Sequence, residues 1–263
     1  MTHRCALSES KSTLVKGWCI SKLGAAIRGL VTRDAAIYGP ELRLYGGPAD
    51  DLELRYIPFD PLPAPDARVV LVGITPGRTQ LRLAMPAARQ ALLRGLDDDE
   101  VIRRAKSAAA FGGSMRASLV WMLDRIRLPD ALGIASTETV FGANAHLAVT
   151  TSAVCHPVFV HGEDWNGTGP SILRHWLTRM FVDEVLALEL RWSPTALVIP
   201  LGKIPALAVQ RCVQAGAIDP ARVLTGVLHP SGANNGRIYG PVLRERLPDL
   251  QRQVAAWRSQ SSS

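Results

Sequence analysis

The stretch "VVLVGITPGR", residues 69–78, is typical of a buried strand that ends in a sharp turn. Val69 to Val72 form an uninterrupted apolar run, which favours a strand covered on both faces. Gly73 and the pair Pro76-Gly77 follow, and glycine and proline supply turn conformations. In α/β proteins such a turn often faces a ligand, although a strand that merely ends in a turn explains the same residues.

Strands and helices are predicted to alternate along the chain after residue 68. The expected strands are 69–74, 146–154, 195–202 and 221–228. The expected helices are 83–107 (broken near Gly95 and restarted by the acids of 97–100), 114–126, 170–190, 203–216 and 239–257. This alternation favours parallel pairing with right-handed crossovers. We therefore expect an α/β fold, a three-layer α/β/α sandwich with a central, mainly parallel, four-stranded sheet.

The first 60 residues precede this alternating region. Apolar spacing predicts a helix over 11–32, and residues 52–59 alternate as a short strand does. Three prolines within 60–68 predict an extended connector. We expect residues 1–60 to be an extension packed on an α/β domain of 61–258, and residues 259–263 to be a disordered tail.

Composition limits the classes of protein that this chain can belong to. The 263 residues are 47% hydrophobic, which is enough for a substantial core, and the net charge of +7 is compatible with a polyanionic partner such as nucleic acid. Its four cysteines form no CxxC pair, so zinc and iron–sulfur spacing are absent and we expect no metal and no cofactor. No apolar run reaches 18 residues. We expect a cytoplasmic monomer that does not enter a membrane.

The loop after the last expected strand has a second concentration of polar groups. It reads "LHPSGANNGR", residues 228–237. His229 comes at the strand end, and Ser231 could hold a phosphate with its hydroxyl and amide groups. Asn234, Asn235 and Arg237 add further donors. The alternative is a surface loop with a solvated histidine.

These two motifs together resemble the uracil-DNA glycosylase superfamily. "GITPG" is similar to that family's first motif, a Gly-x-Asp/Asn/Ala-Pro turn, and "HPSGANN" is similar to its last, a His-Pro-Ser loop. Three stretches between them resemble the iron–sulfur-type branch in the same order: "AAAFGGSMRASLVWMLDRI" (108–126), "VTTSAVCHP" (149–157) and "VIPLGKIPALAV" (198–209). The resemblance covers about residues 68–250, and the cysteines that would bind the cluster of that branch are missing.

The resemblance implies a DNA glycosylase, which flips a base out of DNA and hydrolyses its bond to the sugar. By this likeness His229 stabilises the negative charge on the departing base, and Phe111 stacks on the flipped base. Gly73, Ile74 and Ser152 would line the base pocket. Contacts to DNA are expected from Pro76, Gly77, Arg78, Lys203, Ser231, Gly232, Asn234, Asn235 and Arg237. For Phe111 a place in the core, and for Lys203 and Arg237 a solvated surface, are the alternatives.

Two departures from the family pattern bear on the substrate. Thr75 stands where many members carry an Asp or Asn that activates water, and a hydroxyl cannot take the proton of water at neutral pH. Another branch has a Glu one position earlier, where this chain has Ile74. Ser152 replaces the asparagine that reads uracil. The expected substrate is therefore DNA that contains uracil or a modified cytosine, such as the hydroxymethylated or glucosylated cytosine of phage DNA.

The insert "HPVFVHGEDWNGTGPS", residues 156–171, could supply the missing water activator. In that hypothesis the insert is a lid, and Asp164 provides the carboxylate. A solvated loop is one alternative, and a metal held by His156, His161 and Asp164 is a weaker one, since no other ligand cluster is visible.

Two other functions fit the same residues. The chain could be a member of the superfamily that binds DNA but cleaves poorly, because the usual carboxylate is absent. It could also be a nucleotide-binding α/β enzyme that uses "GITPG" on a phosphate. Abasic-site formation separates the enzyme from the binding protein, and nucleotide affinity without DNA affinity would support the third interpretation.

Overall fold

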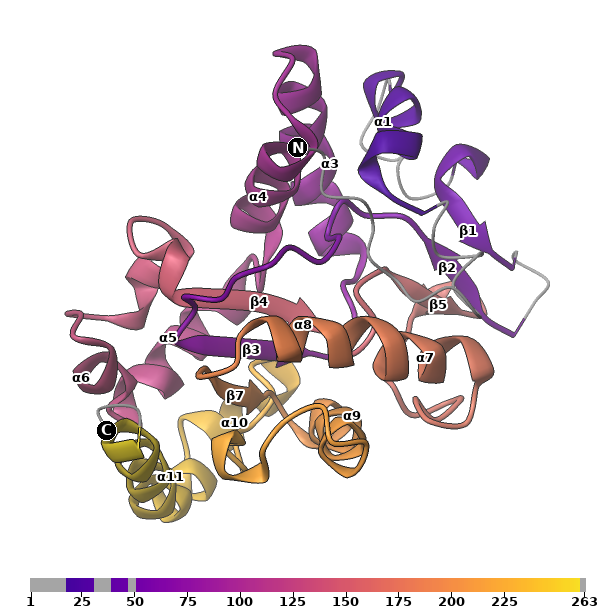
Figure 1. Cartoon of the computed structure of the whole chain (residues 1–263). Helices are drawn as coiled ribbons and strands as arrows, with labels where there is room; N and C mark the ends of the chain where they lie inside the picture. Colours follow the sequence, from indigo (N-terminus) through magenta and orange to yellow (C-terminus); the bar gives the residue numbers. More distant parts are fainter. Residues whose placement is uncertain (1–17, 31–38, 47–50, 261–263) are drawn as a thin grey trace. The chain divides into compact units, whose positions relative to one another are not determined.

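The computed structural model of this chain describes residues 18–30, 39–46 and 51–260 (Figure 1). The chain divides into two compact units, and each is described by itself. The first comprises 1–62, 75–109 and 154–169, and the second comprises 63–74, 110–153 and 170–263. One crossing between the units falls between Ile74 and Thr75, within the "GITPG" turn. The boundary expected near residue 60 lies close to the first crossing, but residues 75–109 and 154–169 also belong to the first unit.

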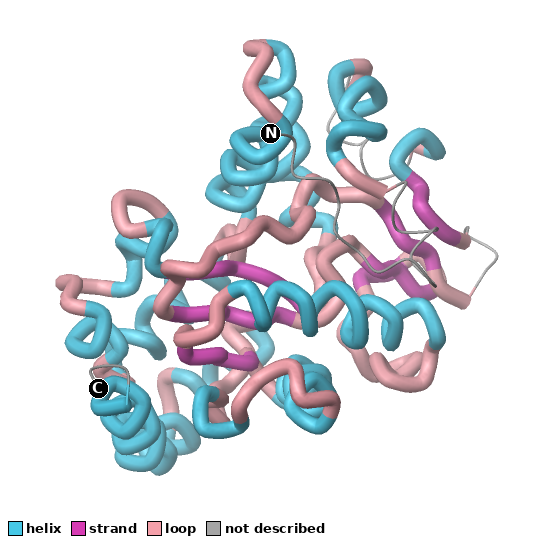
Figure 2. The backbone as a smooth tube through the Cα atoms, in the orientation of Figure 1, coloured by secondary structure: helices cyan, strands magenta, loops and turns pink. Residues whose placement is uncertain are grey.

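A parallel sheet forms the centre of the second unit (Figure 2). Strand β3 (Val69–Gly73) lies between β4 (Ala148–Ser152) and β7 (Leu197–Pro200). Both neighbours run parallel to β3, in registers that pair Val72 with Thr151 on one side and with Pro200 on the other. The strands expected at 69–74, 146–154 and 195–202 are therefore confirmed.

The fourth expected strand, 221–228, does not form. Val223 makes a single parallel bridge to Val198 of β7, where the Leu224 N–H also donates to the Val198 carbonyl at 2.9 Å. Gly226 then adopts a φ of +94°, which takes the backbone out of the extended range before a ladder can develop. The parallel sheet of the described residues has three strands, with this segment beside β7.

Helices cover both faces of this sheet (Figure 1). Val69 and Leu71 share an apolar core with residues of α5 (Ser114–Arg125) and α11 (Pro241–Gln260). On the opposite face, Thr151 donates a hydrogen bond to Glu189 of α8 (Ala187–Trp192). The other helices of this unit are α6 (Leu128–Leu132), α7 (Trp176–Met180), the π-helical segment η5 (Phe181–Leu186), α9 (Lys203–Gln214) and α10 (Asn235–Ile238). The helix expected at 170–190 thus begins only at Trp176.

In the part of the first unit that the structure describes, four strands form an antiparallel sheet. Their order is β1 (Arg43–Tyr45), β2 (Glu53–Arg55), β5 (Val158–Val160) and β6 (Glu163–Asp164). The described helices of the unit are α1 (Ile20–Arg28), α3 (Arg78–Leu93) and α4 (Asp98–Ala109). Short 3₁₀ helices are described at Pro40–Leu42 in this unit and, in the second unit, at Thr137–Phe141, Ala145–Leu147, Pro220–Arg222 and Gly232–Asn234. Of the helix expected over 11–32, the structure shows α1 from Ile20 to Arg28, with Cys19 as its N-cap and Gly29 as its C-cap, so the expected bounds were too wide. Residues 11–17 and 31–32 lie outside the described residues.

Helices α3 and α4 reproduce the expected break near Gly95. The carboxylate of Asp97 accepts the Glu100 N–H at 2.8 Å, and Asp98, Asp99 and Glu100 occupy the first turn of α4. Negative charge at this end of a helix is stabilising, because the amide groups there point outward without intrahelical partners. Buried faces of both helices join one apolar core with Ile27, Tyr56 and other residues of this unit.

Part of the insert 156–171 is a β-hairpin, which corrects the alternative of a solvated loop, whereas the lid hypothesis stays a prediction. Strands β5 and β6 pair through Phe159 with Asp164 and Val160 with Glu163. His161 and Gly162 join them with positive φ at both residues, which is typical of tight hairpin turns. β5 also pairs with β2, so the insert is built into the antiparallel sheet.

The chain is thus a mixed α/β protein with a parallel sheet in one unit and an antiparallel sheet in the other. Among its described helices, none is both long enough and apolar enough to cross a membrane. The disordered tail expected at 259–263 is wrong for residues 259 and 260, which belong to α11, and residues 261–263 lie outside the described residues.

Candidate functional site

Three of the predicted base-binding residues meet at the carboxyl end of strands β3 and β4. Gly73 and Ser152 end these strands and are paired in register. A Cβ atom added to Gly73 would lie 3.2 Å from Ser152 Oγ and 3.4 Å from Cε1 of Phe111. A side chain at position 73 would crowd both neighbours. Glycine at this position therefore leaves space for the serine hydroxyl and the phenyl ring beside the end of β3. Ile74, the fourth residue, follows directly and is half-buried.

Phe111 is held in a conformation that a phenylalanine seldom adopts. Its φ is +50°, in the left-handed region where a Cβ-bearing residue is strained by about 1 kcal/mol. The Arg116 guanidinium donates to the carbonyl of Ala110 at 2.8 Å and stabilises the same loop. Such strain persists only where the surrounding structure enforces it, and it is more frequent at functional sites.

His229 lies against the start of helix α9. Gly202 precedes this helix with a φ of +92°, and a Cβ atom there would be only 2.9 Å from the Cβ of His229. The Gly202 N–H donates to the Val227 carbonyl at 3.0 Å, which ties the end of β7 to the segment before His229. Glycine is therefore required at 202 for both its backbone conformation and this close approach. Sequence reasoning included "LGK" in a resemblance but did not recognise this role.

The imidazole of His229 is prepared to act as a neutral hydrogen-bond donor. Its Nδ1 accepts the backbone N–H of Ser231 at 3.3 Å, so in the neutral ring the proton sits on Nε2. Burial lowers the pKa of His229, because a low-dielectric environment disfavours the imidazolium. Within the described residues no hydrogen bond engages Nε2. The ring can therefore donate from Nε2 at neutral pH without carrying a charge.

The rest of the 228–237 loop separates into internal and outward groups. The side-chain amide of Asn234 donates to the His229 carbonyl and to Ser231 Oγ, each at 3.2 Å, so it holds the loop together. Sequence reasoning assigned it to DNA. Gly232, Asn235 and Arg237 are exposed on this loop, as is Lys203 at the first turn of α9. These exposed residues, together with the half-buried Ser231, can reach a ligand.

The turn of Thr75, Pro76, Gly77 and Arg78 belongs to the first unit, where each residue makes local contacts. The hydroxyl of Thr75 donates to the backbone carbonyl of His156 at 2.8 Å. Pro76 is buried, and the Gly77 N–H donates to Gln80 at 2.9 Å in the first turn of α3. The Thr75 hydroxyl is thus engaged as a structural donor, which leaves only its lone pairs to orient a water molecule.

Asp164 lies beside this turn, at the N-terminus of α3. Its two oxygens accept the Arg78 N–H at 3.2 and 3.3 Å, and a Cβ atom on Gly77 would be 2.8 Å from Oδ2. The Arg78 guanidinium pairs with Glu163 at 3.1 Å and lies over the ring of Phe159. Arg78, expected on DNA, is therefore bound to the β5–β6 hairpin. Asp164 keeps an exposed side chain, at 47% of its surface.

A buried polar cluster of Tyr56, Asp60 and His156 was missed from the sequence. The Tyr56 hydroxyl donates to Asp60 Oδ2 at 2.5 Å, and its ring lies 5.1 Å from the His156 ring. Burial raises the pKa of Asp60 to about 7, against the opposing effect of the Tyr56 hydrogen bond. Burial likewise lowers the pKa of His156 to about 3. The signal available was an acid within the apolar run "YIPFD", 56–60.

The metal hypothesis for the insert is not supported by this arrangement. His156 is buried beside Tyr56, whereas His161 and Asp164 are exposed on the hairpin. Over residues 18–30, 39–46 and 51–260, no group of three or more His, Cys, Asp or Glu side chains could hold a metal ion.

A curated relative is similar to most of this chain. It is described as the uncharacterized protein YoxB of Bacillus subtilis (strain 168), and the two are 32% identical over 209 residues. That alignment covers 79% of this chain and 81% of the relative. No family model matches the chain, and no solved structure matches it.

Proposed function

The chain belongs to the family of the Bacillus subtilis protein YoxB, whose description assigns no activity, and from the chain's own site we propose that it is a DNA glycosylase. In this proposal it flips a pyrimidine out of DNA and hydrolyses the N-glycosidic bond, leaving an abasic site. It acts as a monomer in the cytoplasm. The observation that carries the proposal is the neutral imidazole of His229, which can donate from Nε2 at the carboxyl side of the parallel sheet.

The chemistry of base release explains why such a donor is useful. As the glycosidic bond breaks, negative charge develops on the departing pyrimidine and positive charge on the sugar. A neutral N–H aimed at a base oxygen stabilises that anion. Unlike a charged imidazolium, it does not repel the positive charge that develops on the sugar. Preorganised donors of this kind typically supply about 10²–10³ in rate, and the Ser231 and Gly202 contacts preorganise this one.

The grouping of Gly73, Phe111 and Ser152 supports a base-binding role at the ends of β3 and β4. An aromatic ring and a close backbone offer a flat surface on which a base can stack. Ser152 is shorter than an asparagine and leaves more space at the edge of the base, which favours a substituted pyrimidine. We therefore propose uracil or a modified cytosine, such as hydroxymethylated or glucosylated cytosine of phage DNA, as the substrate.

Asp164 is the better of the two proposed water-activating groups. The Thr75 hydroxyl donates to the His156 carbonyl, and a hydroxyl is in any case a poor base at neutral pH. Asp164 retains an exposed carboxylate although it accepts the Arg78 N–H, so it can orient a water molecule and accept its proton. In the superfamily that this chain resembles, an Asp or Asn at the position of Thr75 activates the attacking water. In this proposal Asp164 performs that role.

Contacts to DNA are proposed for the exposed loop around His229. Lys203 and Arg237 supply cations, Asn235 and Ser231 supply neutral donors, and Gly232 allows the backbone to approach a phosphate. The net charge of +7 favours a polyanion in general. We take the three-stranded sheet, extended at Val223 by its bridge, as the counterpart of the four-stranded parallel sheet of a glycosylase sandwich.

The test is abasic-site formation on a panel of DNA substrates. The panel contains single- and double-stranded uracil oligonucleotides and phage DNA with hydroxymethylated or glucosylated cytosine. His229→Ala is compared with His146→Ala, which removes an exposed histidine of the same unit. We expect cleavage of at least one substrate, its loss in His229→Ala, and its retention in His146→Ala.

Other outcomes of this experiment would favour one of the two alternative functions or contradict the role of His229. Salt-sensitive DNA binding without abasic sites on any substrate would overturn the enzyme and favour a DNA-binding protein. Nucleotide affinity without DNA affinity would favour a nucleotide-binding enzyme. Cleavage that His229→Ala leaves intact would contradict the assigned role of the imidazole.

A further inference from the structure

The first turn of α5 holds the loop that precedes it, residues 110–113. Arg116 donates from Nη2 to the Ala110 carbonyl at 2.8 Å and from Nε to the same oxygen at 3.3 Å. The backbone N–H of Arg116 donates to the Gly113 carbonyl at 3.2 Å. Phe111 lies between these two carbonyls in the sequence, so one arginine fixes the chain on both sides of it.

The guanidinium of Arg116 also lies over the ring of Phe141. Its Cζ is 4.7 Å from the ring centroid, and Phe141 ends the 3₁₀ helix Thr137–Phe141. Burial lowers the pKa of Arg116, and a cation is held more strongly by an aromatic ring where water is excluded. A guanidinium can donate in its own plane and stack on a ring at the same time, which the ammonium group of a lysine cannot do. The combination of contacts therefore requires arginine.

The loop held in this way carries one ring of the candidate base-binding site. A Cβ atom on Gly73 would lie 3.4 Å from Cε1 of Phe111 and 3.2 Å from Ser152 Oγ. A small displacement of the loop would therefore move the ring towards the strand ends or away from them. Arg116 and all of its partners named above belong to the second unit, as do Gly73 and Ser152.

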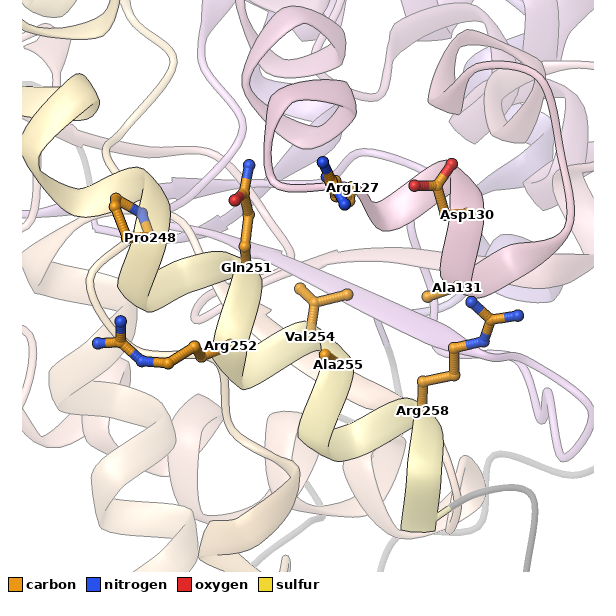
Figure 3. A pocket seen from close by; sticks show the side chains of 9 residues that line it. All are labelled: Arg127, Asp130, Ala131, Pro248, Gln251, Arg252, Val254, Ala255 and Arg258. Carbon is orange, nitrogen blue, oxygen red and sulfur yellow. The ribbon is translucent and has the colours of Figure 1, made fainter.

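The backbone of Phe111 can be compared with that of Arg127. Phe111 comes two residues after α4 and has a φ of +50°, and Arg127 comes two residues after α5 and has a φ of +62°. Glycine is the usual residue at this position after a helix, because it has no Cβ atom. The Arg127 side chain is exposed and lines a pocket of about 470 Å³ between α6 and α11 (Figure 3). Phe111 is half-buried, and the carbonyl before it accepts two hydrogen bonds from Arg116.

We propose that Arg116 is a positioning residue of the base-binding site. It holds Phe111 where the phenyl ring can stack on the flipped base, and it does not contact the base itself. This inference rests on the proposed glycosylase function, which places a base against Phe111. If Arg116 only stabilised the fold, it would affect base binding independently of Phe111. A positioning role predicts instead that Arg116 has no effect on base binding once the ring of Phe111 is absent.

Fluorine NMR of the full chain labelled with 4-fluorophenylalanine tests the positioning without a substrate. The chain has five phenylalanines, and the variants Phe111→Leu and Phe141→Leu identify two of the five resonances. Both resonances should shift in Arg116→Lys, because the guanidinium leaves one ring and the backbone of the other loosens. Arg125→Lys is the matched control, since Arg125 lies on the same helix over the ring of Trp121 at 4.3 Å. It should leave both resonances unchanged, and both lysine variants keep the positive charge.

Kinetics on the DNA substrate that the abasic-site panel identifies test the effect on base binding. Arg116→Lys should raise KM about fivefold and leave kcat within about twofold, because a displaced ring weakens the bound base before and during the reaction alike. Phe111→Leu should raise KM about tenfold, since it removes the stacking surface. The double variant should be no worse than Phe111→Leu alone. Arg125→Lys should keep the original KM, and thermal melts confirm that each variant is folded at the assay temperature.

Three results would overturn the proposal. They are an unmoved Phe111 resonance in Arg116→Lys, equal effects of Arg116→Lys and Arg125→Lys on KM, and effects of Arg116→Lys and Phe111→Leu that multiply in the double variant. The absence of abasic sites on every DNA of the panel would overturn the proposed function and, with it, the base-binding role of Phe111. A shifted Phe111 resonance would in that case still show that Arg116 holds the ring, so the two failures are distinguishable.

Discussion

The two units each contain a histidine whose pKa is lowered by burial, and the two imidazoles differ in what they can still bind. His156 is 2% exposed, lies beside the Tyr56 ring and has a pKa of about 3. His229 is half-buried and accepts the Ser231 N–H at Nδ1, and burial lowers its pKa as well. Both rings are neutral at pH 7, but only His229 can present an N–H to a ligand.

This difference separates two uses of the same side chain. A completely enclosed histidine contributes packing and internal hydrogen bonds, and it cannot take part in chemistry unless the unit opens. A histidine at the end of a sheet with one nitrogen fixed by backbone has a defined tautomer and direction. Burial alone therefore does not identify a functional histidine. The better criterion is whether the second ring nitrogen is accessible to a ligand.

The largest expected effect comes from removing the enclosed imidazole. His156→Ala should lower the free energy of unfolding by about 3 kcal/mol, because a filled aromatic position becomes a cavity beside Tyr56. His229→Ala should change it by less than about 1 kcal/mol. Urea denaturation of both variants checks this contrast. Similar destabilisation by the two substitutions would show that His229 is also a structural residue.

Asp60→Asn is expected to stabilise the protein above neutral pH. The folded-state pKa of Asp60, about 7, is higher than its ordinary value of 3.8, so the folded state retains the proton longer than the unfolded chain. Stability therefore falls as pH rises from about 4 to 7 and stays lower above. The asparagine variant lacks this loss and should gain about 2–3 kcal/mol at pH 8 relative to pH 5. The amide oxygen of the asparagine can still accept a hydrogen bond from the Tyr56 hydroxyl.

Thermal melts of Asp60→Asn at pH 5 and pH 8 measure this gain, with Asp51→Asn as an exposed control in the same unit. His156 acts in the opposite direction, since its lowered pKa removes stability as pH falls from about 6.5 towards 3. Because His156 is unchanged in Asp60→Asn, its contribution cancels when the variant and the original protein are compared at the same pH. An equal gain at both pH values would contradict the raised pKa.

Gly202→Ala should disturb the neighbourhood of His229 from the backbone. Its φ of +92° and the 2.9 Å approach to the His229 Cβ together predict a loss of about 2 kcal/mol in stability. Any activity on DNA should fall as well, because the imidazole must move. Gly232→Ala serves as the comparison for stability alone, since a Cβ atom there meets nothing within 4 Å. Unchanged stability and activity in Gly202→Ala would refute the close approach.

The smallest effect is expected at Thr75. Thr75→Val removes the hydroxyl that donates to the His156 carbonyl and should cost about 1 kcal/mol, while Thr75→Ser should cost less. Activity per folded molecule should remain within about twofold of the original, because Asp164 is the proposed water activator. A loss of activity in Thr75→Val without a loss of stability would return the catalytic role to the hydroxyl.

Local sequence pattern was sufficient for most elements of the second unit. The apolar runs of β3, β4 and β7 and the helical spacing of α5, α9 and α11 predicted their positions, because each of these elements buries a face set by its own residues. The pattern failed at 221–228, where Gly226 ends the extended backbone after one bridge. It also failed at 156–171, since the partner of β5 is β2, a strand about a hundred residues earlier in the chain.

The candidate site shows the same division. His229, Ser152, Phe111 and Gly73 were predicted by strand ends and by resemblance, and the last three lie close together in the structure. Their role in binding a base stays a prediction. The internal engagement of Asn234 and Arg78 could not be predicted, because a polar side chain in a loop has the same sequence signal whether it faces solvent or the loop itself.

The sequence by itself determined that a parallel α/β sheet would carry polar groups at its strand ends, because apolar periodicity and turn residues act over a few neighbours. Only the tertiary structure decided which of those groups remain available to a ligand. Hydrogen bonds between Thr75 and His156, Tyr56 and Asp60, and Ser231 and His229 depend on distances in space. Burial by residues distant in the chain then set the protonation of His229, His156 and Asp60.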